Sequence, residues 1–442
     1  MRISAVCACL WISLIFANAG LAGEPDAAGA KPLFKNFMGV CGHTVQFKPE
    51  LYKATCGLVR DYHPIDWDFG NDTSYATKFP MARNQVDWNQ VYGSWKKSGY
   101  TTDVSAMFDN MKPESWKDLP KDAKAYGAAF ARYFGPSGQN LVSSVEIGNE
   151  PGKYNDTVYR TMFESMASGL REGDPKMLVA TCACVAGKSH AYAKSVTCFE
   201  GLENLFDAIN IHTYAQVKGW PTWERSYPED PKIPYLKDVD AVIAWREKHA
   251  AGKQIWITEF GWDASTKQPP KTGDFAKWVG STETQQAQYL VRSFMVFSKM
   301  PVDRAYIYFF NDSDQPQMHG SAGLTRDFKP KPAFHAVAHL YSTLGQYRFA
   351  RSIEEKTGEV YAYEFTHADD RSKKIWAVWS PTGSARQGEV TLPLAGFEVV
   401  KAEQMPLTAG APAAIEIKKQ DGNIVVPVGE SPIYVMLQAK GP

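Results

Sequence analysis

Eight short apolar segments, separated by helix-like segments, occupy most of residues 36–344. The apolar segments are rich in the β-branched and aromatic residues that strands favour, and they cover Asn36–Cys41, Gly57–Asp61, Thr101–Met107, Val142–Ile147, Met177–Cys182, Asp207–His212, Gln254–Glu259 and Arg304–Phe310. Helical patterns lie between them at Trp88–Ser98, Lys121–Phe134, Thr157–Glu172, Asp238–His249 and Thr282–Lys299. Strands that alternate with helices predict a parallel sheet, and eight such strands predict a closed (β/α)₈ TIM barrel.

A doubly wound open sheet is the alternative α/β architecture. Its usual nucleotide-binding form carries Gly-x-Gly-x-x-Gly after the first strand, and that motif is missing here. The barrel is therefore the favoured fold class.

After a last helix-like segment, Lys331–Leu344, the pattern changes to alternating apolar and polar residues with turn residues between the segments. This pattern is typical of a small antiparallel β-sandwich. The expected strands are Val360–Phe365, Lys374–Trp379, Glu389–Leu392, Ala414–Ile417, Asn423–Val428 and Ile433–Leu437. We therefore predict a catalytic barrel at residues 34–347 and a C-terminal sandwich at residues 348–442.

The N-terminus has the features of a secretory signal peptide. Arg2 precedes the apolar run Ile3–Phe16, and small residues follow as candidate cleavage sites. We assign residues 1–22 to the signal peptide and 23–33 to a linker, and expect a secreted protein, periplasmic or extracellular. The apolar run is short for a membrane span, so no stable membrane association is expected.

The charge balance and the cysteines indicate which ligands and cross-links to expect. Lys and Arg together number 48, as do Asp and Glu, so no net field favours nucleic acid. Removal of a signal peptide would leave five cysteines, an odd number, with Cys41–Cys56 and Cys184–Cys198 as the candidate disulfides. Cys182-Ala-Cys184 lacks the second ligand pair of a zinc site, and we predict no metal.

Two of the predicted strands end in a glutamate. The fourth leads into Asn149-Glu150-Pro151, and the seventh ends at Glu259. Alternation along a strand predicts that Ile255, Ile257 and Glu259 share one face. Because active sites of TIM barrels form at the carboxyl ends of the strands, the two acids are expected to converge there. Such a pair suits glycoside hydrolysis, whereas two solvated loop glutamates are the alternative.

At these motifs the chain resembles the retaining glycoside hydrolases of clan A. The matching elements are Asn149-Glu150-Pro151 and Thr258-Glu259-Phe260-Gly261-Trp262, and the order of elements agrees over about residues 35–345. The resemblance implies that Glu150 is the acid/base, that Glu259 is the nucleophile, and that Asn149 binds the sugar 2-hydroxyl.

The same resemblance implies further site residues. Tyr214, after the sixth strand, would hydrogen bond Glu259, and His212 beside it would contact the sugar or a carboxylate. Arg60, at the end of the second strand, would stabilise the ionised nucleophile. His63, on the loop that follows, would line the pocket for the reacting sugar.

Strand eight departs from the common clan pattern, in which a tryptophan supports the reacting sugar. Here the segment reads Tyr306-Ile-Tyr-Phe-Phe-Asn-Asp312 and has no tryptophan. Alternation along the strand indicates Phe310 as the residue that takes the place of this tryptophan, and Trp262 is the other candidate for supporting the sugar. Trp220, Trp223 and Trp278, on the loops after strands six and seven, are predicted to stack on further sugar units.

The sequence therefore predicts a secreted retaining glycosidase that cleaves β-linked oligo- or polysaccharides without a cofactor. A transglycosylase that uses the same residues and a non-catalytic carbohydrate-binding barrel are the alternatives. Neither Gly-x-Ser-x-Gly nor His-Glu-x-x-His occurs, which disfavours a serine hydrolase and a zinc hydrolase. The sugar, the linkage and the oligomeric state are left open.

Overall fold

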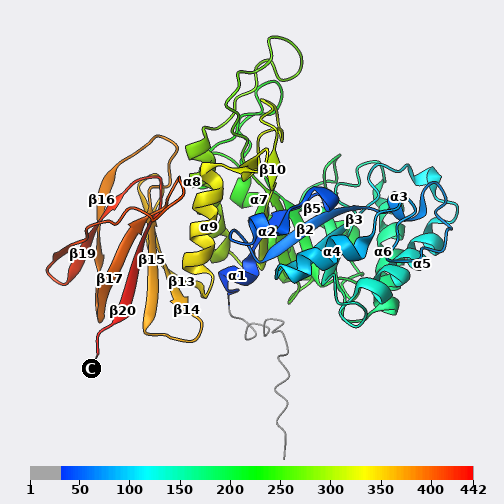
Figure 1. Cartoon of the computed structure of the whole chain (residues 1–442), viewed down its shortest axis with the longest axis horizontal. Helices are drawn as coiled ribbons and strands as arrows, with labels where there is room; N and C mark the ends of the chain where they lie inside the picture. The colour runs from blue at the N-terminus through cyan, green and yellow to red at the C-terminus, as the bar shows by residue number, and fades with distance from the viewer. Residues whose placement is uncertain (1–30, 442) are drawn as a thin grey trace, which may run out of the picture. The chain divides into compact units, whose positions relative to one another are not determined.

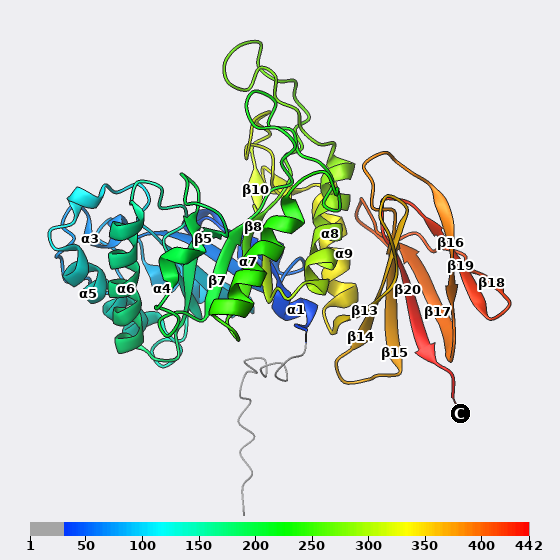
Figure 2. The ribbon, with the colours of Figure 1, turned by 180° about the vertical axis from the view of Figure 1, so that it is seen from behind.

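The computed structural model describes residues 31–441, which form one compact unit (Figures 1 and 2). The predicted signal peptide, and all but the last three residues of the predicted linker, lie outside the described residues. At the start of this unit, Lys31 Nζ donates to the carbonyl oxygens of Lys299 and Met300, at 2.8 and 2.6 Å.

Eight parallel strands form a closed barrel. In spatial order they are β1 (Met38–Cys41), β2 (Leu58–Pro64), β3 (Thr101–Met107), β4 (Ser144–Ile147), β5 (Leu178–Val185), β7 (Ala208–His212), β8 (Gln254–Phe260) and β9 (Arg304–Ile307). Pairing of β1 with β9 and of β4 with β5 completes the ring. The TIM-barrel prediction is confirmed, and the open-sheet alternative is excluded.

Long helices surround this barrel. They are α4 (Trp88–Lys97), α5 (Leu119–Phe134), α6 (Asp156–Gly173), α7 (Tyr235–His249), α8 (Glu283–Lys299) and α9 (Pro332–Leu344). Polar side chains cap the N-termini of several of these helices. Asn155 accepts a hydrogen bond from Val158 N at the start of α6, and Thr282 and Gln285 form a capping box on α8. Between β5 and β7, the described chain forms the short strand β6 (Lys194–Ser195) and the 3₁₀ turn η3 (Val196–Phe199) in place of a long helix.

Shorter elements fill the connections. They are α1 (Phe34–Phe37), η1 (Thr44–Gln46), α2 (Pro49–Tyr52), α3 (Asp66–Phe69), η2 (Pro113–Ser115), β6 (Lys194–Ser195), β10 (Asn311–Asp312), β11 (Thr325–Arg326) and β12 (Lys329–Pro330).

The C-terminal part consists of two antiparallel sheets, as the sandwich prediction requires. One has the order β13 (Tyr347–Lys356), β14 (Val360–His367), β15 (Lys373–Trp379), β20 (Ile433–Ala439), β17 (Phe397–Gln404). The other has the order β16 (Gly388–Pro393), β19 (Asn423–Val428), β18 (Lys418–Gln420). The predicted strand Ala414–Ile417 is wrong: it forms only one isolated bridge, between Glu403 and Ala414.

Strand β14 of the five-stranded sheet is buried on both faces, because its alternate residues enter two different cores. Val360 and Ala362 pack toward the three-stranded sheet. Tyr361, Tyr363 and Phe365 belong to the large core that includes the barrel helices. Phe34 of α1 contacts Phe365, with ring centroids 5.4 Å apart. The barrel and the sandwich therefore share one hydrophobic core.

Neither of the two candidate disulfides is present, and both expectations are wrong. The five cysteines in the described part of the chain are buried free thiols, and Cys41 Sγ donates to Thr258 O at 3.2 Å. Within residues 31–441, none of the helices combines the length and the apolar character needed to cross a bilayer.

Removal of the sandwich is expected to abolish solubility of the barrel. A chain that ends at Gln346 would expose the apolar surfaces of α8 and α9 that now pack against β13–β15. Size-exclusion chromatography should show aggregated material, and a monodisperse truncated protein would contradict this expectation.

Candidate active site

A β-bulge in β8 turns Glu259 toward the barrel mouth. Ile211 pairs with Ile257, but the next residue, His212, pairs with Glu259, so β8 contains one extra residue at Thr258. Ile255 and Ile257 pack outward in the large core. The predicted shared face of Ile255, Ile257 and Glu259 is therefore wrong, although Glu259 does lie at the mouth.

Four groups surround the Glu259 carboxylate, whose residue is only 6% exposed. Arg60 Nη1 at 3.2 Å and the Tyr62 hydroxyl at 2.6 Å donate to Oε1. The Tyr214 hydroxyl donates to Oε2 at 2.7 Å, and His212 Nδ1 lies 3.7 Å from the same oxygen. These groups leave the carboxylate with donors at both oxygens.

This environment keeps Glu259 ionised. Burial alone would raise its pKa, but the charges of His212 and Arg60 and the hydroxyl donors of Tyr62 and Tyr214 outweigh burial and lower the pKa to about 2. Glu259 is therefore a carboxylate throughout the neutral pH range.

Arg60 is held from its other side by Glu146 of β4. The guanidinium donates from Nε and Nη2 to the two oxygens of Glu146, at 2.9 and 2.7 Å, with both side chains fully buried. Nη2 also donates to Asn149 Oδ1 at 2.9 Å, and Asn210 Nδ2 donates to Glu146 at 2.8 Å. Arg60 thus contacts Glu259 directly and also contacts Asn149, the residue before Glu150.

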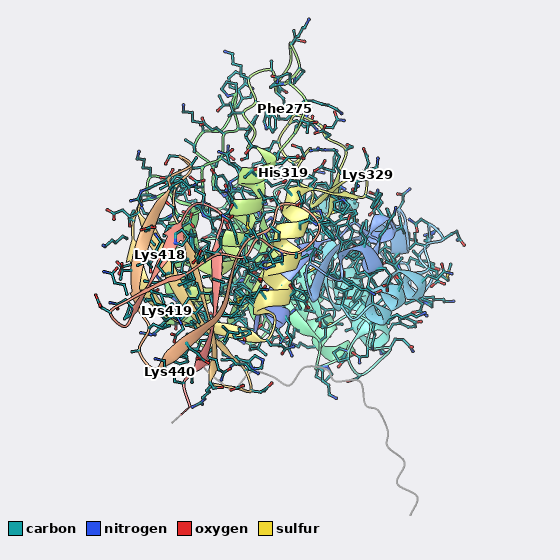
Figure 3. The ribbon with its side chains drawn as sticks, turned by 60° about the vertical axis from the view of Figure 1, so that its left-hand side comes forward. Phe275, His319, Lys329, Lys418, Lys419 and Lys440 are labelled. Carbon is teal, nitrogen blue, oxygen red and sulfur yellow. The ribbon has the colours of Figure 1, made fainter. Side chains whose placement is uncertain are left out.

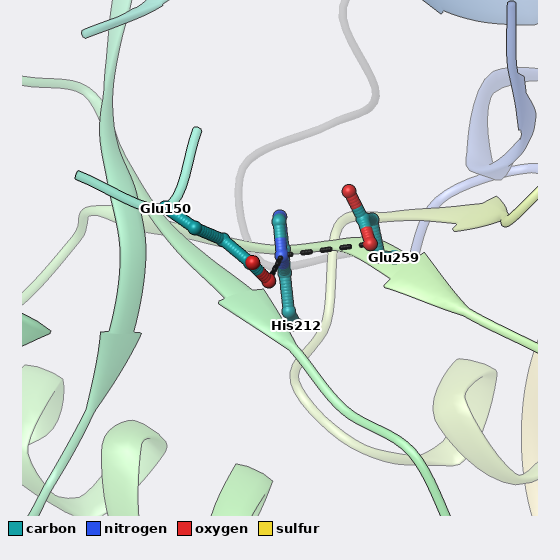
Figure 4. A group of neighbouring side chains, drawn as sticks. All are labelled: Glu150, His212 and Glu259. Atoms are coloured by element: carbon teal, nitrogen blue, oxygen red, sulfur yellow. Dashed lines mark hydrogen bonds and ion pairs between the residues drawn. The ribbon is translucent and has the colours of Figure 1, made fainter. Parts of the chain in front are cut away.

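Glu150 lies across the mouth from Glu259, with His212 between them (Figure 4). His212 Nδ1 is 2.9 Å from Glu150 Oε1, and one oxygen of each glutamate and this nitrogen lie within 4.8 Å of one another. Burial lowers the pKa of His212, but the two glutamates outweigh it and raise the pKa above its usual value. Asp109 accepts from the backbone N–H of Asn149, at 3.1 Å, and from that of Glu150, and so fixes the turn.

Glu150, His212 and Glu259 could geometrically hold a metal ion. However, both oxygens of Glu259 already accept hydrogen bonds, and the Arg60 guanidinium, a fixed positive charge, is 3.2 Å away. A nearby cation of this kind opposes binding of a second one. The cluster is better suited to holding and moving protons.

The structure brings Arg60, Asn149, Glu150, His212, Tyr214 and Glu259 together, but three other predicted residues do not reach the site. Phe310 is 1% exposed and packs against Phe47 and Tyr52. Because β9 ends at Ile307, strand alternation no longer applies at residue 310.

Trp262 and His63 are fully buried and serve the core instead. Trp262 Nε1 donates to Ser226 O at 2.7 Å. His63 bonds the Tyr92 hydroxyl at 2.6 Å and Asp68 at 2.7 Å, and it stacks on Trp88. Their predicted contacts with sugar are wrong.

Several residues at the mouth were not singled out from the sequence. Tyr62 follows Arg60 by two residues, so strand alternation could have identified it. His319, which is labelled in Figure 3, contacts Tyr308 with ring centroids 5.0 Å apart, and it also contacts Tyr214. Within the described chain, His319 Nδ1 and His43 Nε2 are buried without a hydrogen-bond partner, and no sequence signal marked these two histidines.

The three rim tryptophans differ in exposure. Trp220 is 68% exposed, whereas Trp278 is 6% exposed and packs on Gly280. Trp223 is partly buried. Of the three, Trp220 alone presents an open face that could stack on a ligand.

No family model and no curated protein sequence matches the chain. Among solved structures, it is similar to a family 39 glycoside hydrolase from the gut symbiont Bacteroides cellulosilyticus WH2, at 19% identity and a TM-score of 0.65, over 93% of this chain and 81% of that one. It is also similar to a family 30 subfamily 8 xylanase from Clostridium acetobutylicum, at 12% identity and a TM-score of 0.58, over 93% and 98%.

A glucosidase from Croceicoccus marinus is a third similar structure, at 13% identity and a TM-score of 0.61, over 95% and 98% of the two chains. At these identities the likeness concerns the fold. It supports the barrel with a C-terminal sandwich that the sequence pattern predicted.

Loss of either tyrosine hydroxyl at Glu259 should raise the pKa of that carboxyl. Tyr62→Phe and Tyr214→Phe each remove one donor to the charged form, worth about 1.5–3 kcal/mol or roughly one to two pH units. A titration of Glu259 by carbon-13 NMR should show the shift. Tyr159→Phe, whose hydroxyl donates to Ile147 O, is the matched control, and an equal pKa in all variants would contradict the expectation.

The same pKa predicts how stability depends on pH. Because the folded-state pKa of Glu259, about 2, is below the ordinary value of 4.5, ionisation of this group stabilises the fold above pH 4.5. That contribution is lost as the pH falls toward 2. Denaturant titrations of the wild type and Glu259→Gln should therefore differ less at low pH than at neutral pH.

Proposed function

We propose that this protein is a retaining glycoside hydrolase that cleaves β-linked oligo- or polysaccharides. The observation that carries the proposal is a pair of glutamates with oxygens within 4.8 Å of each other, one of them held ionised. Carboxyl groups about 5–5.5 Å apart serve a nucleophile and an acid/base, whereas inverting enzymes separate theirs by about 6.5–9.5 Å to admit a water.

In the first step, a Glu259 oxygen attacks the anomeric carbon and the bond to the leaving-group oxygen breaks. Glu150 donates its proton to that oxygen, and a glycosyl ester forms on Glu259. Asn149 directs its carbonyl oxygen to Arg60, which makes its amide nitrogen the donor for the sugar 2-hydroxyl. The unpartnered nitrogens of His43 and His319 are candidates for binding further hydroxyls.

In the second step, the Glu150 carboxylate takes a proton from water, and the resulting hydroxide attacks the anomeric carbon. The ester bond breaks and Glu259 returns as a carboxylate, again bonded by Tyr62, Tyr214 and Arg60. The hydrogen bond between His212 Nδ1 and Glu150 Oε1 keeps Glu150 directed toward the mouth in both steps.

The fold neighbours guide the choice of substrates, because one is described as a xylanase and another as a glucosidase. Aryl β-xylosides, aryl β-glucosides and the corresponding polysaccharides are therefore the first compounds to test.

We also propose that Trp220 stacks on a distal sugar unit. Trp220→Ala should then raise the KM for polysaccharides and leave the KM for aryl glycosides unchanged. Export of the chain, with cleavage near residue 22, is part of the proposal, and N-terminal sequencing of secreted material tests it.

Glu150→Gln and Glu259→Gln should each reduce turnover by about 10³-fold or more, because each step loses its proton donor or its nucleophile. Glu200→Gln, at an exposed glutamate that is none of the site residues described above, is the matched control. With an activated aryl glycoside, azide should restore product formation in Glu150→Ala as a β-glycosyl azide. Full activity of either glutamine variant would exclude this mechanism.

The stereochemistry gives a second test. Two displacements restore the original configuration, so proton NMR should show the β-anomer as the first product from a β-glycoside. An α-anomer formed first would mean that Glu259 acts as a base on water. Products extended by an added acceptor alcohol would indicate transglycosylation by the same residues.

A further inference from the structure

One long loop connects the candidate nucleophile with the C-terminal sandwich. This loop, residues 213–234 between β7 and α7, is called the rim loop below. Near its start, Tyr214 donates to Glu259 Oε2 at 2.7 Å. Near its end, Glu229 is buried between α8 of the barrel and β15 of the sandwich. The two ends thus contact the two functional parts of the molecule.

Glu229 occupies a fully enclosed polar socket. Its Oε1 accepts from Arg292 Nε at 2.9 Å and from Trp379 Nε1 at 2.6 Å, and its Oε2 accepts from Arg292 Nη2. The side chains of Glu229 and Arg292 are both completely buried. Both carboxylate oxygens of Glu229 thus depend on donors from two other elements, one in the barrel and one in the sandwich.

The sandwich also holds Arg292 in place. Arg292 Nη1 donates to Thr382 O at 2.9 Å and lies 3.8 Å from Glu430 Oε2. The Thr382 hydroxyl in turn donates to Glu430 Oε1 at 2.9 Å. The socket for Glu229 therefore exists only with the sandwich docked on the barrel.

Three residues of the rim loop, Ala215, Arg225 and Ser226, connect this anchor to Tyr214. Ser226 N donates to Ala215 O at 2.8 Å, so the segment before Glu229 lies alongside the segment after Tyr214. The guanidinium of Arg225 lies 4.3 Å over the Tyr214 ring, and its Nη1 donates to Gly261 O and to Asp263. Tyr214 is thus pressed against Glu259 by a segment whose far end is fixed at the sandwich.

We propose that Glu229 and Trp379 are positioning residues of the active site, through which the sandwich holds the rim loop and Tyr214 against Glu259. The sandwich is then part of the catalytic apparatus although none of its atoms contacts the reacting carbon. This inference rests on the proposed glycosidase function only for its effect on turnover. Its effect on the rim loop and on Glu259 is independent of any substrate.

The sandwich offers an unusually close control for the test. Trp376, three residues before Trp379 on β15, also donates its Nε1 to a buried glutamate, Glu364, at 3.0 Å. That pair lies within the sandwich, in the core of the two sheets, and is not connected to the rim loop. Trp379→Phe and Trp376→Phe therefore remove the same kind of hydrogen bond from the same strand, and Glu229→Gln and Glu364→Gln form a second matched pair.

The primary measurement is hydrogen–deuterium exchange of the peptide that covers residues 213–229 in the full chain. In Trp379→Phe we expect exchange of this peptide to be about tenfold faster, whereas Trp376→Phe should match the wild type. The pKa of Glu259, followed by carbon-13 NMR, should rise by about one unit in Trp379→Phe and stay unchanged in Trp376→Phe. Where an aryl glycoside is turned over, kcat should fall about tenfold and KM should change little.

Equal exchange and an equal Glu259 pKa in Trp379→Phe and Trp376→Phe would overturn the proposal. If Trp379→Phe does not fold, Glu229→Gln is compared with Glu364→Gln by the same two measurements, exchange of the 213–229 peptide and the pKa of Glu259. A wild type that cleaves no β-glycoside would refute the proposed function alone, because the exchange and titration results still report on the coupling.

Discussion

The buried guanidinium of Arg60 is the charge on which the mouth of the barrel depends. It binds Glu146 through two hydrogen bonds and Glu259 through one, and all three side chains are removed from solvent. Burial alone would raise the pKa of Glu259, and the fixed positive charge of Arg60 is one of the groups that lower it instead. Replacement of Arg60 alone would leave uncompensated charge, which typically costs about 3–5 kcal/mol.

Much of the fold and part of the site could be predicted because their signals are local. Strand-like and helix-like segments are recognisable from a few consecutive residues, and Glu150, Glu259, Arg60 and Tyr214 each stand at the end of a strand-like segment. In a parallel barrel all such ends meet on one side. Sequence position alone was therefore enough to bring these side chains together.

The features that the sequence did not reveal depend on contacts between distant segments. The bulge at Thr258 arises from the register between β7 and β8, so simple alternation wrongly grouped Glu259 with Ile255 and Ile257 on one face. Trp262 and His63 looked available for sugar because their burial depends on Ser226 and Trp88, partners that no local pattern identifies. The two candidate disulfides failed for the same reason, since spacing along the chain does not bring thiols together.

Burial of β14 on both of its faces has a thermodynamic consequence. A sandwich with its own separate core could melt while the barrel stayed intact, and calorimetry would record two transitions. Here the outer face of β14 lines one core and its inner face the other, so opening either core breaks the packing of the same strand. We therefore expect the two halves to unfold as one cooperative unit, with a single heat-absorption peak whose calorimetric and van't Hoff enthalpies agree.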